Sequence, residues 1–113
     1  MIKITGLSKN AKQTFILPLE TRETVTFKLY YMPTQSAWFF DFNYNDEDYT
    51  GQRLVLGMNI LRMYKNALPF GLAVRAENHI EPFDVTDLTD RVELYVLNQD
   101  EVNTVETEIF GVE

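Results

Sequence analysis

Few side chains in this chain have the types and spacing that metal binding or nucleophilic catalysis requires. The sequence holds one histidine and no cysteine, so thiolate ligands, thiol nucleophiles and disulfides are excluded. His79 stands between Glu77 and Glu81, a spacing that would place all three side chains on one face of a strand. The segment around them is polar and has the composition of a loop, and one histidine beside acids supplies too few ligands. We therefore predict no metal site here.

Acidic residues cluster at two further places, 46–48 and 84–87, and neither has the ordered spacing of a calcium-binding loop. Asp41 lies in an aromatic segment where a glycosidase could place a carboxylate, but the strand period points it away from Trp38. The sequence also lacks a P-loop, a nucleophile elbow and a dinucleotide-binding glycine motif. A small hydrolase using Asp41, Asp84 or Asp87 is therefore disfavoured, and we predict a protein that is not an enzyme and needs no cofactor.

The aromatic residues concentrate in one predicted strand. Residues 36–44 include the only tryptophan and four other aromatic side chains. At the two-residue period of a strand, one face is wholly aromatic and the other carries Phe39 and Asp41. The aromatic face consists of Trp38, Phe40, Phe42 and Tyr44. Large aromatic side chains build protein cores and also bind sugars and proteins, so this strand belongs either to the core or to a binding platform.

A second segment, residues 24–31, has the clearest alternation in the chain. Its apolar face consists of Val25, Phe27, Leu29 and Tyr31. The connection 32–35 is short and contains a proline, so we expect the two segments to pair as an antiparallel hairpin. The aromatic face then lies in the core with the apolar face of its neighbour. Tyr30 and Phe39 remain on the opposite face of the sheet.

Short apolar runs separated by turn signals predict the rest of the fold. Further strands are expected at 13–19, 51–57, 70–75 and 91–98, with a polar turn at 45–48. Residues 84–88 are predicted to form one helical turn capped by Asp84, and 58–66 fits a helical turn or a continued strand. The sequence thus predicts an all-β, mainly antiparallel fold: a small barrel or sandwich of about 6–8 short strands with at most one or two short helical turns.

Charge is distributed unevenly along the 113 residues, a length that suits a single domain. Residues 1–76 hold nine Lys and Arg against six acids, whereas 77–113 hold only Arg91 against eleven acids. An acidic end repels phosphates and anionic lipids, so we expect no direct binding of nucleic acid or membrane. No apolar run is long enough to span a bilayer, and the start lacks a secretory signal. The acidic tail 99–113 is expected to be flexible or ordered by a partner.

Five blocks of the sequence form a recognisable pattern through their order and spacing. The blocks are Ser-Ala-Trp-Phe-Phe-Asp at 36–41, Gly-Gln-Arg-Leu-Val-Leu-Gly-Met-Asn-Ile-Leu at 51–61, Arg-Val-Glu-Leu-Tyr-Val-Leu at 91–97, Gln-Thr-Phe at 13–15 and Leu-Pro-Phe-Gly at 68–71. Together they resemble the small baseplate plug family of contractile-tailed bacteriophages. The resemblance covers about residues 13–102. It implies a structural virion protein at the centre of the tail baseplate, synthesised in the cytoplasm of a bacterial host, with no catalytic residues.

The same resemblance implies contacts with the hub, the spike and the tail tube, and it allows several copies to meet around the tail axis. Candidate contact residues come from the second faces of the strands and from the acidic end. They are Tyr30, Phe39, Tyr95, Asp100, Glu101 and Glu106. The alternative function is a carbohydrate-binding β module that uses the aromatic strand, with Trp38 as a stacking platform.

Overall fold

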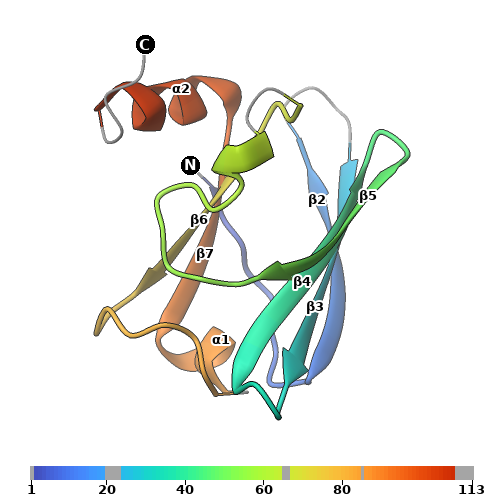
Figure 1. Ribbon diagram of the computed structural model, residues 1–113, viewed down its shortest axis with the longest axis vertical. Coiled ribbons are helices and arrows are strands. Elements are labelled where there is room, and N and C mark those ends of the chain that lie inside the picture. Colours follow the sequence, from blue (N-terminus) through green and yellow to red (C-terminus); the bar gives the residue numbers. More distant parts are fainter. Residues whose placement is uncertain (1, 20–23, 65–66, 85, 109–113) are drawn as a thin grey trace.

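The computed structural model describes residues 2–19, 24–64, 67–84 and 86–108, and within them seven strands form two antiparallel sheets that face each other (Figure 1). The four-stranded sheet follows chain order: β2 (Lys12–Pro18), β3 (Thr24–Met32), β4 (Ala37–Tyr44) and β5 (Glu47–Arg53). The three-stranded sheet has the order β1 (Ile2–Lys3), β7 (Val92–Leu97) and β6 (Gly71–Ala76). The predicted all-β, antiparallel fold is confirmed, in the form of a small sandwich.

The core lies between the sheets, and the aromatic strand builds one wall of it. In β3 and β4, Phe27 lies opposite Phe42 and Leu29 lies opposite Phe40, so both inner faces are apolar. Trp38 is fully buried. Leu72, Val74 and Leu94 of the other sheet join the same core. The prediction that Trp38, Phe40 and Phe42 lie in the core with Val25, Phe27 and Leu29 is therefore confirmed. Tyr31 and Tyr44, predicted to lie there too, are half-buried and pack against it.

A row of aromatic rings crosses the inner face of the four-stranded sheet, one ring from each strand. Phe15 stacks on Phe27 at 5.4 Å between centroids, Phe27 on Phe42 at 5.2 Å, and Phe42 on Tyr49 at 4.6 Å. Such pairs add to the burial energy when their rings are offset or tilted, at about 0.5–1.5 kcal/mol each. The row aligns the four strands at this level, and beyond it a bulge shifts the register of β5 by one residue, between Phe40 and Phe42.

The turn between β4 and β5 is shorter than predicted. Only Asn45 and Asp46 form it, with φ of 53° and 63°, and Tyr44 pairs directly with Glu47. Two consecutive residues with positive φ characterise the tight hairpin turn that matches the twist of paired strands, and Asn and Asp tolerate that conformation. The predicted turn at 45–48 and strand at 51–57 are therefore wrong in their bounds. The strand begins at Glu47 and ends at Arg53.

After β5 the chain crosses to the three-stranded sheet. Leu54 still donates its N–H to the Trp38 carbonyl at 2.8 Å, and Gly57 then pairs with Val74 at the edge of β6. A single 3₁₀ turn, η1 (Arg62–Tyr64), follows. This crossing segment, which Figure 1 shows joining the two sheets, lies where the sequence left a choice between strand and helical turn.

Helices occur in two places, and both differ from expectation. The helical turn α1 (Asp87–Asp90) begins later than predicted, and its N-cap position is Thr86 and not Asp84. Residues 99–108, expected to be a flexible or partner-ordered tail, form α2 (Gln99–Glu108). Asn98 and Glu101 exchange hydrogen bonds of 2.8 and 3.0 Å between side chain and backbone N–H, a capping box that satisfies free N–H groups at the helix start.

Helix α2 packs on the outer face of the three-stranded sheet. Val102 and Val105 are buried there with Ala73 and Leu97. Their separation of three residues places them on one face of a helix. The described part of the tail is therefore ordered by contacts within the chain. Residues 109–113, the rest of the predicted tail, lie outside the described residues.

Candidate functional site

The residues that could have formed a metal or catalytic centre are not brought together. Among the described residues, no three His, Asp or Glu side chains gather closely enough to hold a metal ion. His79 is exposed in a turn at φ 57°, and the Glu81 carboxylate accepts the Leu56 N–H at 2.6 Å. Asp41 accepts hydrogen bonds from Tyr30 and from the Gly51 N–H. In the described part of the chain, no helix is long and apolar enough to cross a membrane.

One charged cluster is well buried, and its role is structural. Arg91 and Asp87 form a two-point ion pair at 2.9 and 3.1 Å, with both side chains largely buried. Arg91 also donates to Asn78 and to the carbonyls of Ile80 and Glu81, at distances of 2.5 to 3.0 Å. The Asp87 carboxylate also accepts hydrogen bonds from the N–H groups of Phe83 and Asp84, at 2.8 and 2.9 Å. The cluster holds the loop before α1 in place.

Sequence reasoning did not find this cluster, although a signal was present. Asp87 and Arg91 are four residues apart, the spacing of an ion pair on one helical turn, and Arg91 is the only cation in the last 37 residues. A single cation near many acids can pair with any of several carboxylates. A buried ion pair is most favourable when all of its hydrogen bonds are made. The burial itself follows from the loop before α1, because Asn78, Ile80 and Glu81 lie next to Arg91 only in the folded chain.

The same loop is tied to the four-stranded sheet by two aromatic side chains. Trp38 donates its indole N–H to the Asp84 carbonyl at 3.0 Å, and Tyr31 donates its hydroxyl to the Phe83 carbonyl at 2.7 Å. Because Trp38 is buried with its polar atom engaged, its ring has no free face on which a sugar could stack. The structure removes Trp38 as the platform of a carbohydrate-binding module.

The six predicted contact residues lie on three separate parts of the surface. Tyr30 and Phe39 are neighbours on the outer face of the four-stranded sheet, Tyr95 lies on the outer face of the other sheet, and the three acids lie on α2. The acids are Asp100, Glu101 and Glu106. Only one of them is exposed: Glu101 caps the helix, and Glu106 is buried against Arg62 at 2.8 Å. Two of the three predicted acids are therefore engaged by contacts within the chain.

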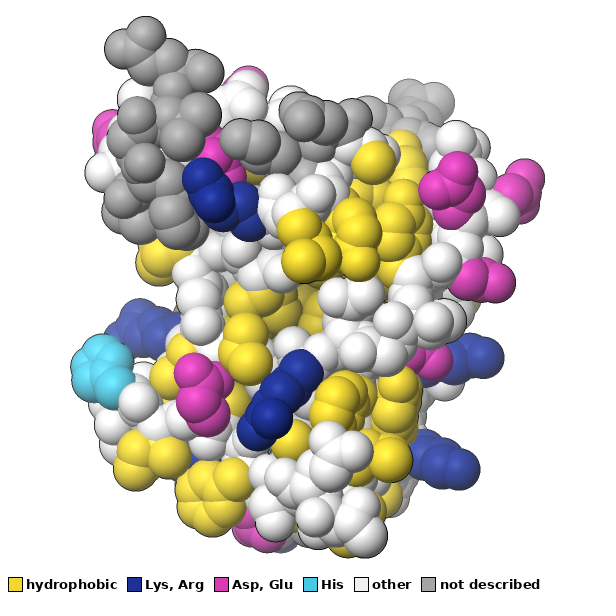
Figure 2. All heavy atoms as spheres, viewed as in Figure 1, with side chains coloured by type: hydrophobic (Ala, Val, Ile, Leu, Met, Phe, Trp, Pro, Cys, Tyr) yellow, Lys and Arg dark blue, Asp and Glu magenta, His cyan; other side chains and the backbone are white. Residues whose placement is uncertain are grey.

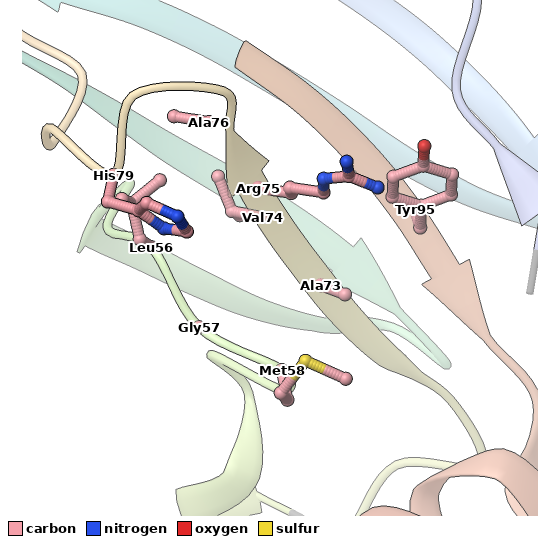
Figure 3. A pocket seen from close by; sticks show the side chains of 9 residues that line it. All are labelled: Leu56, Gly57, Met58, Ala73, Val74, Arg75, Ala76, His79 and Tyr95. Atoms are coloured by element: carbon pink, nitrogen blue, oxygen red, sulfur yellow. The ribbon is translucent and has the colours of Figure 1, made fainter.

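Tyr95 lines an apolar groove of about 510 Å³ on the outer face of β6 and β7. Figure 3 shows Tyr95 beside Arg75, with Met58 and His79 farther along the groove. The Tyr95 hydroxyl donates to the Glu93 carboxylate, and Lys3 lies 3.5 Å from the same carboxylate. The hydrogen bond from Tyr95 is the main cause that lowers the pKa of Glu93, and it raises the pKa of Tyr95 in turn.

Tyr30 and Phe39 form the centre of a row that spans the outer face of the four-stranded sheet. Lys12 lies opposite Tyr30, Tyr30 opposite Phe39, and Phe39 opposite Arg53, so each strand contributes one residue. The two rings stack at 6.1 Å with 18° between their planes. Tyr30 donates to Asp41 at 3.0 Å, and burial, aided by Asp41, raises its pKa. We call these four residues the outer row.

These features define a small β-sandwich protein whose candidate sites are exposed faces of its sheets. The chain belongs to the family described as cyanophage baseplate Pam3 plug gp18, whose model matches residues 1–100. It is thus a phage baseplate plug protein, a structural component of the virion tail. The resemblance to baseplate plug proteins is confirmed, and the match takes in both sheets and ends in the first turn of α2. A comparison with curated proteins found no match.

Proposed function

We propose that this chain acts as the central plug of a contractile-tail baseplate and works by assembling with other tail proteins. The match of the plug family model to residues 1–100 is the observation that carries the proposal. A plug must keep its shape while its surfaces fit against neighbours, which requires a rigid core and uncovered faces. The stacked aromatic core and the buried Asp87–Arg91 cluster are consistent with such rigidity.

The partners we propose are the hub, the spike and the tail tube, with several copies of the chain around the tail axis as a further arrangement. Oligomers of this kind are symmetric, so a small domain can close a central opening by repetition around an axis. The six predicted contact residues remain candidates, with Tyr30, Phe39 and Tyr95 supported by partly exposed aromatic rings. Synthesis in the host cytoplasm, followed by incorporation into the virion, completes the proposal.

Co-expression with the other baseplate proteins of the same phage tests this function. We expect the chain to co-purify with at least one of them as a complex of defined stoichiometry, measured by light scattering after size-exclusion chromatography. The chain expressed alone gives the reference mass and reports self-association. If it neither self-associates nor joins any baseplate protein, the proposed function is wrong.

A further inference from the structure

We infer that the outer face of the four-stranded sheet docks a negatively charged surface of a neighbouring baseplate protein, with the outer row as its centre. This inference rests on the proposed function and adds the surface and the chemistry of the partner. No helix covers this face in the described structure, since α1 and α2 both pack against β7 of the other sheet (Figure 1). Lys12, Thr14 and Lys28 are all exposed on it.

The geometry of the outer row suits an interface centre. Two stacked aromatic rings lie in the middle of the sheet, and a cation lies on each side, on the outermost strands. Three strand spacings separate Lys12 from Arg53, a backbone distance of about 14 Å. Aromatic residues and arginine are enriched at the centres of protein interfaces, and partly exposed rings offer apolar area at little entropic cost.

The cations on this face are available to a partner. Among the described residues, Lys12, Lys28 and Arg53 have no carboxylate within 4.0 Å. Lys28 lies across from Asp41 in the register, but Asp41 is engaged by Tyr30 and Gly51. Lys12, Lys28, Tyr30 and Asp41 border a hollow of about 440 Å³. Because Asp41 already accepts two hydrogen bonds there, an acidic side chain of a partner would pair with the two lysines. Unpaired cations around an apolar centre complement an acidic surface.

The same face is a poor match for nucleic acid. A phosphate backbone requires a continuous positive surface, since each phosphate carries a charge. Here Asp41 lies in the middle of the face. Asp48, which pairs with Asn43, lies farther along the same face, so the positive charge is interrupted twice. The chain carries a net charge of −7, which repels a polyanion at long range. A protein surface can place a few carboxylates opposite the cations and avoid Asp41 and Asp48, so an acidic protein is the partner that fits.

Charged side chains are dispersed over the face of the molecule that Figure 2 shows. Figure 2 shows acidic side chains at the upper right, where the β4–β5 hairpin ends in Figure 1; the exposed acids there are Asp46, Glu47 and Asp48. Elsewhere on that view, single cations and acids alternate with hydrophobic side chains. Arg75, on the outer face of the other sheet, lies across from Glu93 and interacts with it.

The test compares two charge-reversal variants in the co-expression assay with the other baseplate proteins of the same phage. The first carries Lys12→Glu, Lys28→Glu and Arg53→Glu, and the control carries Lys9→Glu, which reverses an exposed cation in the loop before β2. Like charges facing each other across an interface weaken association strongly, so we expect the triple variant to lose binding roughly hundredfold and the control to bind like wild type. Circular dichroism checks that both variants fold, and Phe39→Ala, a smaller change on the same face, should bind about tenfold more weakly.

Each outcome decides the inference. A complex that the triple variant retains at wild-type strength overturns it and leaves the proposed function standing. A loss from Lys9→Glu that is about one third of the triple variant's loss in binding free energy overturns it too, because the effect then scales with the change in net charge, −2 against −6. The absence of any wild-type complex overturns the proposed function and the inference with it. Binding of a DNA duplex to wild type at physiological salt, lost in the triple variant, would replace the acidic protein with nucleic acid.

Discussion

Trp38 donates its indole N–H to the Asp84 carbonyl at 3.0 Å, and this hydrogen bond joins the aromatic strand to the loop that precedes α1. Trp38→Phe removes the bond and part of the buried ring volume. We expect a loss of about 2–3 kcal/mol in the free energy of unfolding, measured by urea denaturation. Tyr31→Phe is the matched control: it removes only the 2.7 Å bond to Phe83, at the surface, and should cost about 1 kcal/mol. Equal costs would contradict the buried role of Trp38.

The burial of Trp38 also predicts its fluorescence. An indole ring out of contact with water emits at shorter wavelength than an exposed one, and Trp38 is the single tryptophan, so the spectrum reports one site. We expect blue-shifted emission that is unchanged by added oligosaccharides. Unfolding in urea supplies the red-shifted reference. Emission that is red-shifted in the native protein and quenched by a glycan would support the carbohydrate-binding alternative.

We expect Arg91 to be one of the positions near the surface where a substitution lowers the folding stability most. Arg91→Ala leaves the Asp87 carboxylate buried without its cation, which costs about 3–5 kcal/mol of folding free energy. Lys3→Ala is the contrasting variant, since the pair with Glu93 is more exposed and should contribute under about 1 kcal/mol. Thermal and urea unfolding measure both effects. The double variant Asp87→Ala with Arg91→Met should recover part of the loss, because no charge then remains unpaired.

The sequence predicted the antiparallel β fold well, while leaving barrel and sandwich open, because its strongest signals are short-range. Alternation in β3 and β4 identifies their inner faces, and a brief connection makes the two strands a hairpin, so Phe27 and Phe40 were placed in the core correctly. The pairing of Tyr30 with Phe39 follows from the same hairpin. These assignments need only the strand period and one turn.

Other features depend on contacts that the sequence does not encode locally. Arg53 joins the outer row because of a bulge in β5. The register set by the Asn45–Asp46 turn alone would align Arg53 with Trp38, and the shift between Phe40 and Phe42 aligns it with Phe39. The order of the acidic tail depends on a cap at Asn98 and on an apolar patch that β6 and β7 create together. Acidic composition suggested a free tail, but Glu101 and Glu106 serve the fold through Asn98 and Arg62.

The capping box makes α2 open to a direct test. Glu101→Ala removes the acceptor for the Asn98 N–H at the start of the helix, and we expect a loss of about 1 kcal/mol. Asp100→Ala changes the neighbouring exposed acid and should alter stability by under about 0.5 kcal/mol. Hydrogen exchange of the Val102 and Val105 amides reports whether the helix itself loosens. Equal exchange rates in both variants would show that the cap does not stabilise α2.

Tyr30 provides a prediction for alkaline pH. Burial, together with the hydrogen bond to Asp41, raises its pKa above the ordinary value of 10. The protonated hydroxyl is the donor, so the stabilisation from this bond is fully present below pH 10 and is lost as the pH rises through the higher folded-state pKa. The free energy of unfolding of wild type should therefore fall more steeply above pH 10 than that of Tyr30→Phe.

The titration itself gives the measurement. The difference in ultraviolet absorbance between wild type and Tyr30→Phe isolates the tyrosinate of Tyr30, and its midpoint should lie above that of an exposed tyrosine. Asp41→Asn removes the negative charge that opposes a second negative charge on Tyr30, so in that variant the midpoint should move down towards 10. An unchanged midpoint would mean that burial alone sets the pKa. In that case Asp41 would hold Gly51 and the β4–β5 register, and would contribute nothing to the titration of Tyr30.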